Sequence, residues 1–408
     1  MSKIFRLFLL FFLFAPLSIL AQSSNFFLFD VTNKSLTNET IDLDRWNYFF
    51  ERTLPPDQRW AGQSELVLLQ EVVQKITYGT FALRIKIDSS LRNSVLAVEV
   101  PSVFSSYRLF ENGRSIGSKG KIGTTKESSI PSVESTVYYF TPGADTIELI
   151  LHVNNFYKGP GGIKGNLRLG ASTLFEQKLH EAKMFDYALF IALFLMGISA
   201  LCFYYVRFEH RNVFLFLSCF SLSWLLRCLF GYHYRILEWM DISWEWVMRI
   251  EYVSMMLTTF FAICFLASLF PEDFKKKVKY IALSVLALFV LSILVLPPSE
   301  FISAIVIYLG FSTIILMYVL TVIAKAFAES RGGSTMMLLT MFFGSVAFGY
   351  AIVCYLAFFE INMVIFNCSF ILLGIMLSFS VSIRLSRMDY LAEKSVLTLE
   401  HFFPGDKK

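Results

Sequence analysis

The sequence predicts two parts, an all-β domain of jelly-roll type followed by an all-α bundle of seven membrane-spanning helices. Of the 408 residues, 55% are hydrophobic, above the roughly 45–50% of an ordinary soluble domain. The apolar residues are concentrated in 1–21 and 184–385, whereas 22–183 have the composition of a water-soluble domain. Within that soluble stretch, several segments alternate apolar and polar residues in the way typical of β-strands. One soluble domain and one polytopic membrane domain are therefore expected.

Residues 1–21 have the pattern of a secretory signal peptide. Lys3 and Arg6 precede an apolar run from Leu7 to Leu20, and the small residue Ala21 follows. An uncleaved membrane anchor is the alternative. The run is short for a span of about 20 residues, which favours cleavage near Ala21.

The β domain is expected over residues 22–175. The stretches "TYGTFALRIKID" and "TIELILHVNNF" alternate apolar and polar residues, which is typical of half-buried strands. Asn112-Gly113 lies between two strand-like runs and predicts a hairpin, because both residue types tolerate positive φ. Short strands separated by Gly and Pro turns favour a sandwich or jelly roll. All six cysteines lie in the membrane half, so no disulfide framework is expected in this domain.

The membrane domain is expected over residues 184–385. Each apolar run approaches or exceeds the length that crosses a bilayer. Only "PPSE" separates the fourth run from the fifth, so a tight proline turn is expected there. The seven predicted spans are about 184–206, 213–231, 247–269, 279–297, 301–324, 335–358 and 362–385.

The charge pattern predicts the orientation of the bundle. Lys and Arg collect after the first, third, fifth and seventh spans, whereas the turns after the fourth and sixth carry only Glu300 and Glu360. Basic loops stay in the cytoplasm, so the tail 386–408 is expected inside and the β domain outside the inner membrane. Arg235 is then counted as a charge of an outer loop. The basic residues that set this orientation are Arg207, Arg211, Lys275, Lys276, Lys277, Lys279, Lys325, Arg331, Arg384, Arg387 and Lys394.

Two ionisable residues inside predicted spans are candidates for function. Arg227 in the second span and Glu251 in the third each lie about four positions from the outer end, so they are expected to meet. Separate snorkelling to the interface is the alternative. Asp186, at the start of the first span, is expected to be interfacial. The scarcity of other mid-bundle charges argues against an ion or proton pathway.

Candidate ligand contacts in the β domain are aromatic and amide residues. Such side chains suit sugar-like ligands, because they offer flat apolar faces beside hydrogen-bond donors and acceptors. Structural roles in the core or in turns are the alternative reading. The candidates are Trp46, Trp60, Asn112, Asn154 and Asn155.

The sequence predicts no catalytic site. It shows no nucleophile–base constellation, and the cysteines lack the usual metal-ligand spacing. We therefore expect a protein that is not an enzyme, with no metal, no cofactor and no nucleic-acid partner.

Several local stretches carry a resemblance to one bacterial family. They are "YGTFALRIKI", "VPSVFSSYRLFENG", "GKIG", "VNNFYKGPGGIKGNLRLG", "SWLLRCLFG" and "RIEYVS". Together with the signal peptide and seven spans, the chain over about 40–395 resembles the seven-transmembrane receptors with diverse intracellular signalling modules (7TMR-DISM). The resemblance implies an outer jelly roll of the galactose- or carbohydrate-binding type that senses a small ligand. It also implies an output kinase, cyclase or phosphatase in the cytoplasm.

The tail 386–408 holds no such output domain. Near-heptad apolar positions predict a docking or dimerising helix that passes the signal to a separate cytoplasmic protein. An amphipathic helix resting on the membrane is the alternative. For the whole chain, the alternatives to a receptor are a membrane-anchored binding or assembly protein and a transporter. The near-heptad residues are Leu385, Met388, Ala392, Leu399 and Phe402.

Overall fold

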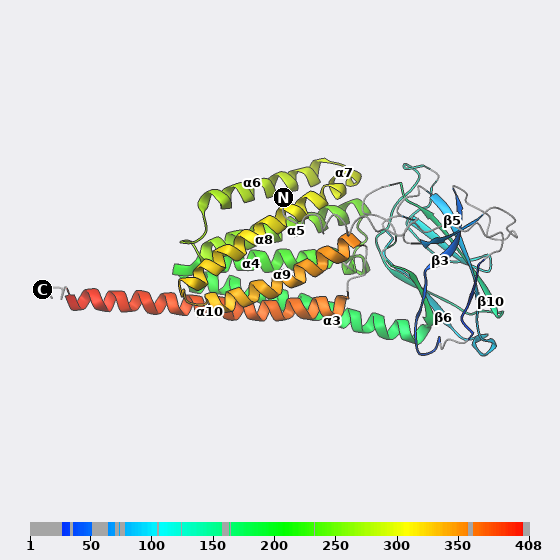
Figure 1. Cartoon of the computed structure of the whole chain (residues 1–408), viewed down its shortest axis with the longest axis horizontal. Helices are drawn as coiled ribbons and strands as arrows, with labels where there is room; N and C mark the ends of the chain where they lie inside the picture. The colour runs from blue at the N-terminus through cyan, green and yellow to red at the C-terminus, as the bar shows by residue number, and fades with distance from the viewer. Residues whose placement is uncertain are drawn as a thin grey trace, which may run out of the picture.

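A β-sandwich lies at one end of the molecule, a helical bundle in the middle, and a single helix projects from the opposite end (Figure 1). The predicted signal peptide and Trp60 fall outside the residues that the structure describes. The structure is a computed structural model, and it describes residues 27–32, 36–50, 64–69, 73, 78–103, 106–123, 125–156, 163, 165–231, 233–357 and 362–402.

Two sheets pack face to face in the β domain. Within the described residues, seven strands form one sheet in the order β4-β3-β5-β10-β7-β8, with β1 added parallel to β5. The pairs along that order are antiparallel. The strands are β1 (Leu28–Asp30), β3 (Arg45–Phe50), β4 (Glu65–Leu68), β5 (Tyr78–Lys86), β7 (Ser106–Glu111), β8 (Arg114–Lys119) and β10 (Thr146–Asn154).

The second sheet has four antiparallel strands among the described residues, in the order β2-β11-β6-β9. From β5 onward the chain passes repeatedly from one sheet to the other, with only the β7–β8 hairpin staying in one. This winding confirms the predicted jelly-roll class. The strands are β2 (Ile41–Leu43), β6 (Leu96–Val100), β9 (Thr136–Phe140) and β11 (Leu167–Ala171).

The alternation read from the sequence sets the core of the sandwich. On β5, Phe81, Leu83 and Ile85 are fully buried between the sheets, while Arg84 lies on the outer face beside Glu148 of β10. The same period of two places Leu149 and Leu151 inward. Because strand side chains alternate between faces, one register satisfies both strands.

Seven helices of the described residues are long and apolar enough to cross a membrane. This confirms the predicted bundle. They are α3 (Ser172–Val206), α4 (Arg211–Phe230), α5 (Trp244–Leu269), α6 (Lys276–Val295), α8 (Ile305–Ala328), α9 (Ser334–Ala357) and α10 (Met363–Phe402). Short elements are η1 (Ser89–Leu91), η2 (Phe208–His210), η3 (Arg235–Glu238) and α7 (Pro298–Ser303), and α7 makes the proline turn expected between the fourth and fifth spans.

Two of these helices are longer than the predicted spans. The helix α3 begins at Ser172, directly after β11, instead of near residue 184. The helix α10 continues without a break to Phe402. At 1.5 Å per residue, α3 is about 52 Å long and α10 about 60 Å, against roughly 30 Å of hydrocarbon. Each therefore carries a rigid extension beyond the bundle, at opposite ends of the molecule (Figure 1).

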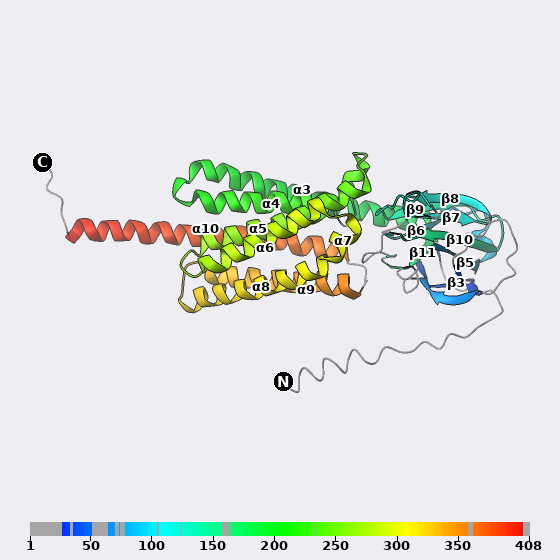
Figure 2. The same ribbon diagram turned by 90° about the horizontal axis from the view of Figure 1, so that it is seen from above.

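The helices α3 and α10 are also neighbours, because α10 packs against both α9 and α3. Figure 2 shows their two extensions leaving the bundle in opposite directions. A second contact joins the sandwich to the bundle, since Val133 belongs to the same buried apolar cluster as Tyr234 and Ile236 near α4 and α5.

The contact between Gly117 and Tyr138 predicts a position in the sandwich that is sensitive to substitution. A Cβ at Gly117 of β8 would overlap the ring of Tyr138 on β9, whereas a Cβ at Gly143 meets nothing within 4 Å. Gly117→Ala should destabilise the sandwich by about 1–3 kcal/mol through overpacking. Gly143→Ala is the matched control and should change stability little. Hydrogen exchange of strand amides in the full-length protein measures both, and equal effects of the two variants would contradict this packing.

Candidate functional site

A buried carboxylate joins three elements at the sandwich end of the bundle. Asp186 of α3 is 5% exposed. Its Oδ2 accepts hydrogen bonds from Arg235 Nε at 2.7 Å and His233 Nδ1 at 2.8 Å, both close to η3. Its Oδ1 accepts one from Asn367 Nδ2 of α10 at 2.9 Å. These four residues are called the outer joint.

The outer joint contains contacts that the sequence did not predict. Asp186, expected at the membrane interface, and Arg235, a residue of the loop after α4, are both buried and paired. The partners of Asp186 lie 47 to 181 residues away along the chain, and no local pattern connects them. A buried, paired ionisable group in a membrane protein is a default candidate for function.

Charges at the rim extend the outer joint. Glu238 accepts from Lys183 Nζ at 2.9 Å and from Arg235 Nη1 at 2.8 Å. Partial burial raises the pKa of the Glu238 carboxyl, but the hydrogen bonds and charges of Lys183 and Arg235 outweigh it and lower the pKa below its ordinary value. Glu238 therefore adds to the free energy of unfolding at pH values above the pKa that its carboxyl has in the unfolded chain. This contribution is lost as pH falls through the lowered pKa of the folded state.

The predicted pair of Arg227 and Glu251 is present. Arg227 Nη1 of α4 donates to Glu251 Oε1 of α5 at 2.8 Å, and Tyr234 Oη donates to Oε2 at 3.2 Å. Tyr234 holds a left-handed φ of 50°, and a Cβ at Gly231 would overlap the Arg227 guanidinium. The turn after α4 is thus shaped around this pair, and sequence reasoning found it because both residues lie at one depth of adjacent helices.

Asn154 holds a loop of the sandwich through a buried hydrogen-bond network. The side chain is buried, and its Oδ1 accepts from Ser129 Oγ at 3.1 Å and from Ser106 Oγ. Its Nδ2 donates to the Gly123 carbonyl at 2.9 Å. Asn154 thereby anchors the segment that leads to Val133, which packs in the apolar cluster of the bundle. Its hydrogen bonds are those of a structural residue.

The other described candidates lie apart. Trp46 is fully buried in the sandwich core and donates from Nε1 to the Leu43 carbonyl, which agrees with the alternative of a structural role in the core. Asn112 occupies the exposed β7–β8 turn with φ 45°, where its Oδ1 accepts from the Glu148 amide. Asn155 is buried and bonds the Val73 carbonyl. Asn112 and Asn154 lie at opposite ends of β10, so the described residues form no single ligand-facing group.

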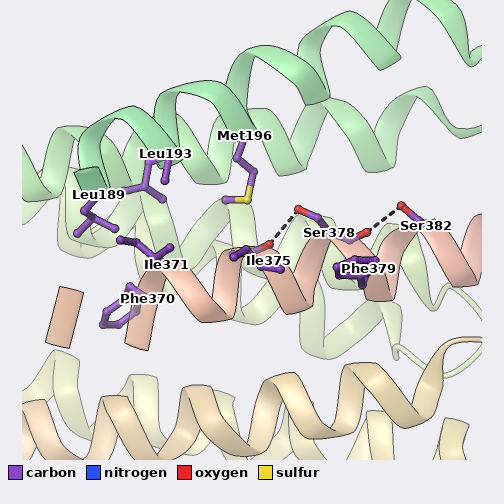
Figure 3. A pocket seen from close by; sticks show the side chains of 11 residues that line it. Leu189, Leu193, Met196, Phe370, Ile371, Ile375, Ser378, Phe379 and Ser382 are labelled. Atoms are coloured by element: carbon purple, nitrogen blue, oxygen red, sulfur yellow. Dashed lines mark hydrogen bonds between the residues drawn. The ribbon is translucent and has the colours of Figure 1, made fainter. Parts of the chain in front are cut away.

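An apolar groove of about 380 Å³ separates α3 from α10 along the middle of the bundle (Figure 3). Leu193 and Met196 of α3 face Ile371 and Gly374 of α10 across it. The Ser378 and Ser382 hydroxyls donate to carbonyls one turn earlier in α10, so they stay satisfied within their own helix. The middle of the α3–α10 contact is therefore loosely filled.

A third set of contacts holds α10 at the end opposite the sandwich. Arg384 is buried, and its guanidinium lies 5.1 Å from the centre of the Phe270 ring. Further along α10, Asp389 pairs with Arg207 Nη1 and His210 Nε2, both at 2.8 Å, from the corner between α3 and α4. The three residues Arg207, His210 and Asp389 are called the inner clasp.

These observations define a multi-pass membrane protein in which a β-sandwich is joined directly to a seven-helix bundle. Residues 182–384, close to half of the chain, match the family model described as 7TM diverse intracellular signalling. The chain belongs to this family of membrane receptors, as the sequence resemblance predicted. No curated protein matches the chain.

Solved structures give only weak likeness. The chain resembles a GH2 β-galacturonidase from Eisenbergiella tayi bound to galacturonate (13% identity, 33% of this chain and 24% of that one, TM-score 0.23). It also resembles Faecalibacterium prausnitzii β-glucuronidase (11%, 28% and 21%, 0.22) and Bacteroides uniformis β-glucuronidase 2 (14%, 32% and 17%, 0.25). The chain spans less than a quarter of each enzyme, and scores this low support no conclusion on ligand or activity.

The outer joint predicts a large cost for losing its carboxylate. Asp186→Asn leaves the buried Arg235 guanidinium with Glu238 at the rim as its remaining counter-charge, which should cost about 1–3 kcal/mol of stability. Asp241→Asn, at an exposed carboxylate of the neighbouring loop, is the matched control and should cost less than about 0.5 kcal/mol. Thermal unfolding of the full-length protein in detergent compares them. Equal unfolding temperatures would show that Asp186 is not an essential partner.

The Arg227–Glu251 pair predicts a measurable coupling. A double-mutant cycle with Arg227→Met and Glu251→Gln should give a coupling free energy of about 1–3 kcal/mol, because both groups are largely desolvated. The helical pair Glu245–Arg249, whose carboxylate is half exposed, serves as reference and should give about 0.3–0.5 kcal/mol. A coupling no larger than this reference would mean that the buried pair adds nothing.

Proposed function

We propose that this protein is a sensory receptor of the bacterial inner membrane. The sandwich binds a small extracytoplasmic ligand, and the bundle passes a conformational signal to a separate cytoplasmic protein. The observation that carries the proposal is the meeting of α3, which continues directly from the sandwich, with α10, which continues into the tail, at Asp186 and Asn367.

In the proposed mechanism, two contacts carry movement from the sandwich into the bundle, and α10 carries it to the tail. Movement of the sandwich reaches the bundle through α3, which starts one residue after β11, and through Val133 in the apolar cluster. Both contacts lead to the turn that holds Tyr234 and Arg235. From there Asp186 and Asn367 lead to α10. A ligand shifts this assembly only if it binds two arrangements with different affinity.

The proposed orientation follows from charge. Basic residues gather at the end of the bundle where α10 leaves, including Arg207, Lys275 to Lys277 and Arg331, whereas the sandwich lies at the other end. The retention of Lys and Arg in the cytoplasm favours a cytoplasmic tail and an external sandwich.

The nature of ligand and partner rests on sequence and family. A carbohydrate-like ligand is proposed because the outer domains of the receptor family that this sequence resembles are carbohydrate-binding-like. A kinase, cyclase or phosphatase is proposed as partner, and a homodimer is an arrangement that the tail helix allows. We further propose that the protein is not an enzyme, because its sequence offers no nucleophile–base constellation.

A second candidate is a membrane-anchored binding or assembly protein that does not signal. An anchor needs neither seven spans nor a polar joint between its first and last helices, so the joint favours the receptor. A transporter is less favoured, because its midplane site would require interrupted helices. The ionisable residues of the outer joint instead lie near the sandwich end of the bundle.

The receptor proposal predicts a specific neighbour of the tail. A photo-crosslinker placed at Tyr390 or Leu391, both exposed on α10, should capture in living cells a protein with a kinase, cyclase or phosphatase domain. A crosslinker at Tyr280, exposed on the membrane face of α6, is the control and should not capture it. The same capture pattern from all three positions would argue for the anchor.

A further inference from the structure

The helix α10 is held at its two ends by contacts of very different character. At the sandwich end, Asn367, which is 2% exposed, donates a hydrogen bond to Asp186 of the buried Asp186–Arg235 pair. At the other end, the side chains of Asp389 and Arg207 are 32% and 57% exposed. A buried hydrogen bond to a charged group is costly to break, whereas a solvent-exposed ion pair shifts an equilibrium by only about two- to fivefold. The two attachments therefore differ strongly in how easily they open.

We infer that the outer joint is a fixed pivot for α10 and that the inner clasp is a releasable latch, which holds the tail helix against the α3–α4 corner in the resting state. This inference deepens the proposed function and rests on it. The latch is weak enough for a ligand of modest differential affinity to open it.

The latch acts on the part of α10 that leaves the bundle. Up to Arg384 the helix is fixed, because Arg384 is buried on Phe270 and the loop at Gly333 packs against the α10 backbone. One turn later, Asp389 bonds Arg207 and His210, and the next residues Tyr390 and Leu391 are exposed. Gly332 lies against Arg387, and Met388 packs on the apolar cluster of the bundle, so opening the clasp would free the segment from about residue 389 to Phe402 without unfolding the bundle.

The loosely filled contact between α3 and α10 makes such movement possible. The groove lies between the outer joint and the inner clasp, and the small residues Gly374, Ser378 and Ser382 of α10 line it (Figure 3). Since the hydroxyls bond their own helix, no polar contact across the groove has to break. A small shift between the two helices then changes the clasp while Asp186 keeps its partners.

The charge balance of the clasp defines the variants that test it. Asp389 faces Arg207 and His210, and the exposed Glu209 lies near enough for its carboxylate oxygen to be within 4.8 Å of the His210 and Asp389 ligand atoms. Glu209, His210 and Asp389 together have the ligand atoms to hold a cation. The test therefore runs in EDTA, so that only the ion pair is measured.

Hydrogen exchange of the full-length protein in lipid nanodiscs, without ligand or partner, tests the latch. Asp389→Asn should speed exchange of amides 389–402 about two- to fivefold and leave those of α4 and α5 unchanged. Glu393→Gln, at an exposed carboxylate one turn further along α10, is the matched control and should leave the tail at the wild-type rate. The reversed pair Arg207→Asp with Asp389→Arg should restore slow exchange.

Two results would overturn the latch. One is a tail exchange rate in Asp389→Asn that equals the wild-type rate within error, since an ion pair that contributes nothing measurable cannot hold the tail helix. The other is equal acceleration by the Glu393→Gln control. Because neither ligand nor partner is present, a positive result together with failed crosslinking would refute the proposed signalling and keep the latch. The reverse pattern would refute the latch alone.

Discussion

A carboxylate buried where α3, η3 and α10 meet constrains much of the surrounding structure. Asp186 needs donors from every side, because an unpaired charge away from water is very costly. Arg235 and His233 can supply them only if the chain after α4 turns back toward α3, and Asn367 only if α10 lies beside it. The first helix, the last helix and the outer turn are thus held in one arrangement.

This arrangement gives two long helices a shared mechanical role. The helix α3 has no linker to absorb movement of the sandwich, and α10 has no break between the membrane and the tail. Rigid elements of this kind transmit displacement, whereas a flexible connection would lose it. Arg227 and Glu251 join α4 to α5 beside the same turn, so two buried ion pairs connect α3, α4, α5 and the turn at the sandwich end of the bundle.

The sequence predicted the elements better than the contacts between them. Periods of two and long apolar runs located the strands and spans, and equal depth in adjacent helices located Arg227 and Glu251. The partners of Asp186 were not predicted because they lie far away in sequence, and the helical stretch "STLFEQKLHEAK" looks like a polar linker. In "RWNYFF", Trp46 and Tyr48 alternate with Arg45 and Asn47, and both are buried in the core, so the period of two favours the structural alternative for Trp46.

The coupling of the outer joint to the tail is the central claim, and a distance measurement tests it directly. Spin labels at Lys277 and Leu391, introduced into a chain without other reactive cysteines, report the position of the tail helix relative to the start of α6. Asp186→Asn, at the far end of α10, should broaden or shift this distance distribution, while Asp241→Asn should not. Identical distributions in all three proteins would contradict the claim that α10 links the two ends of the molecule.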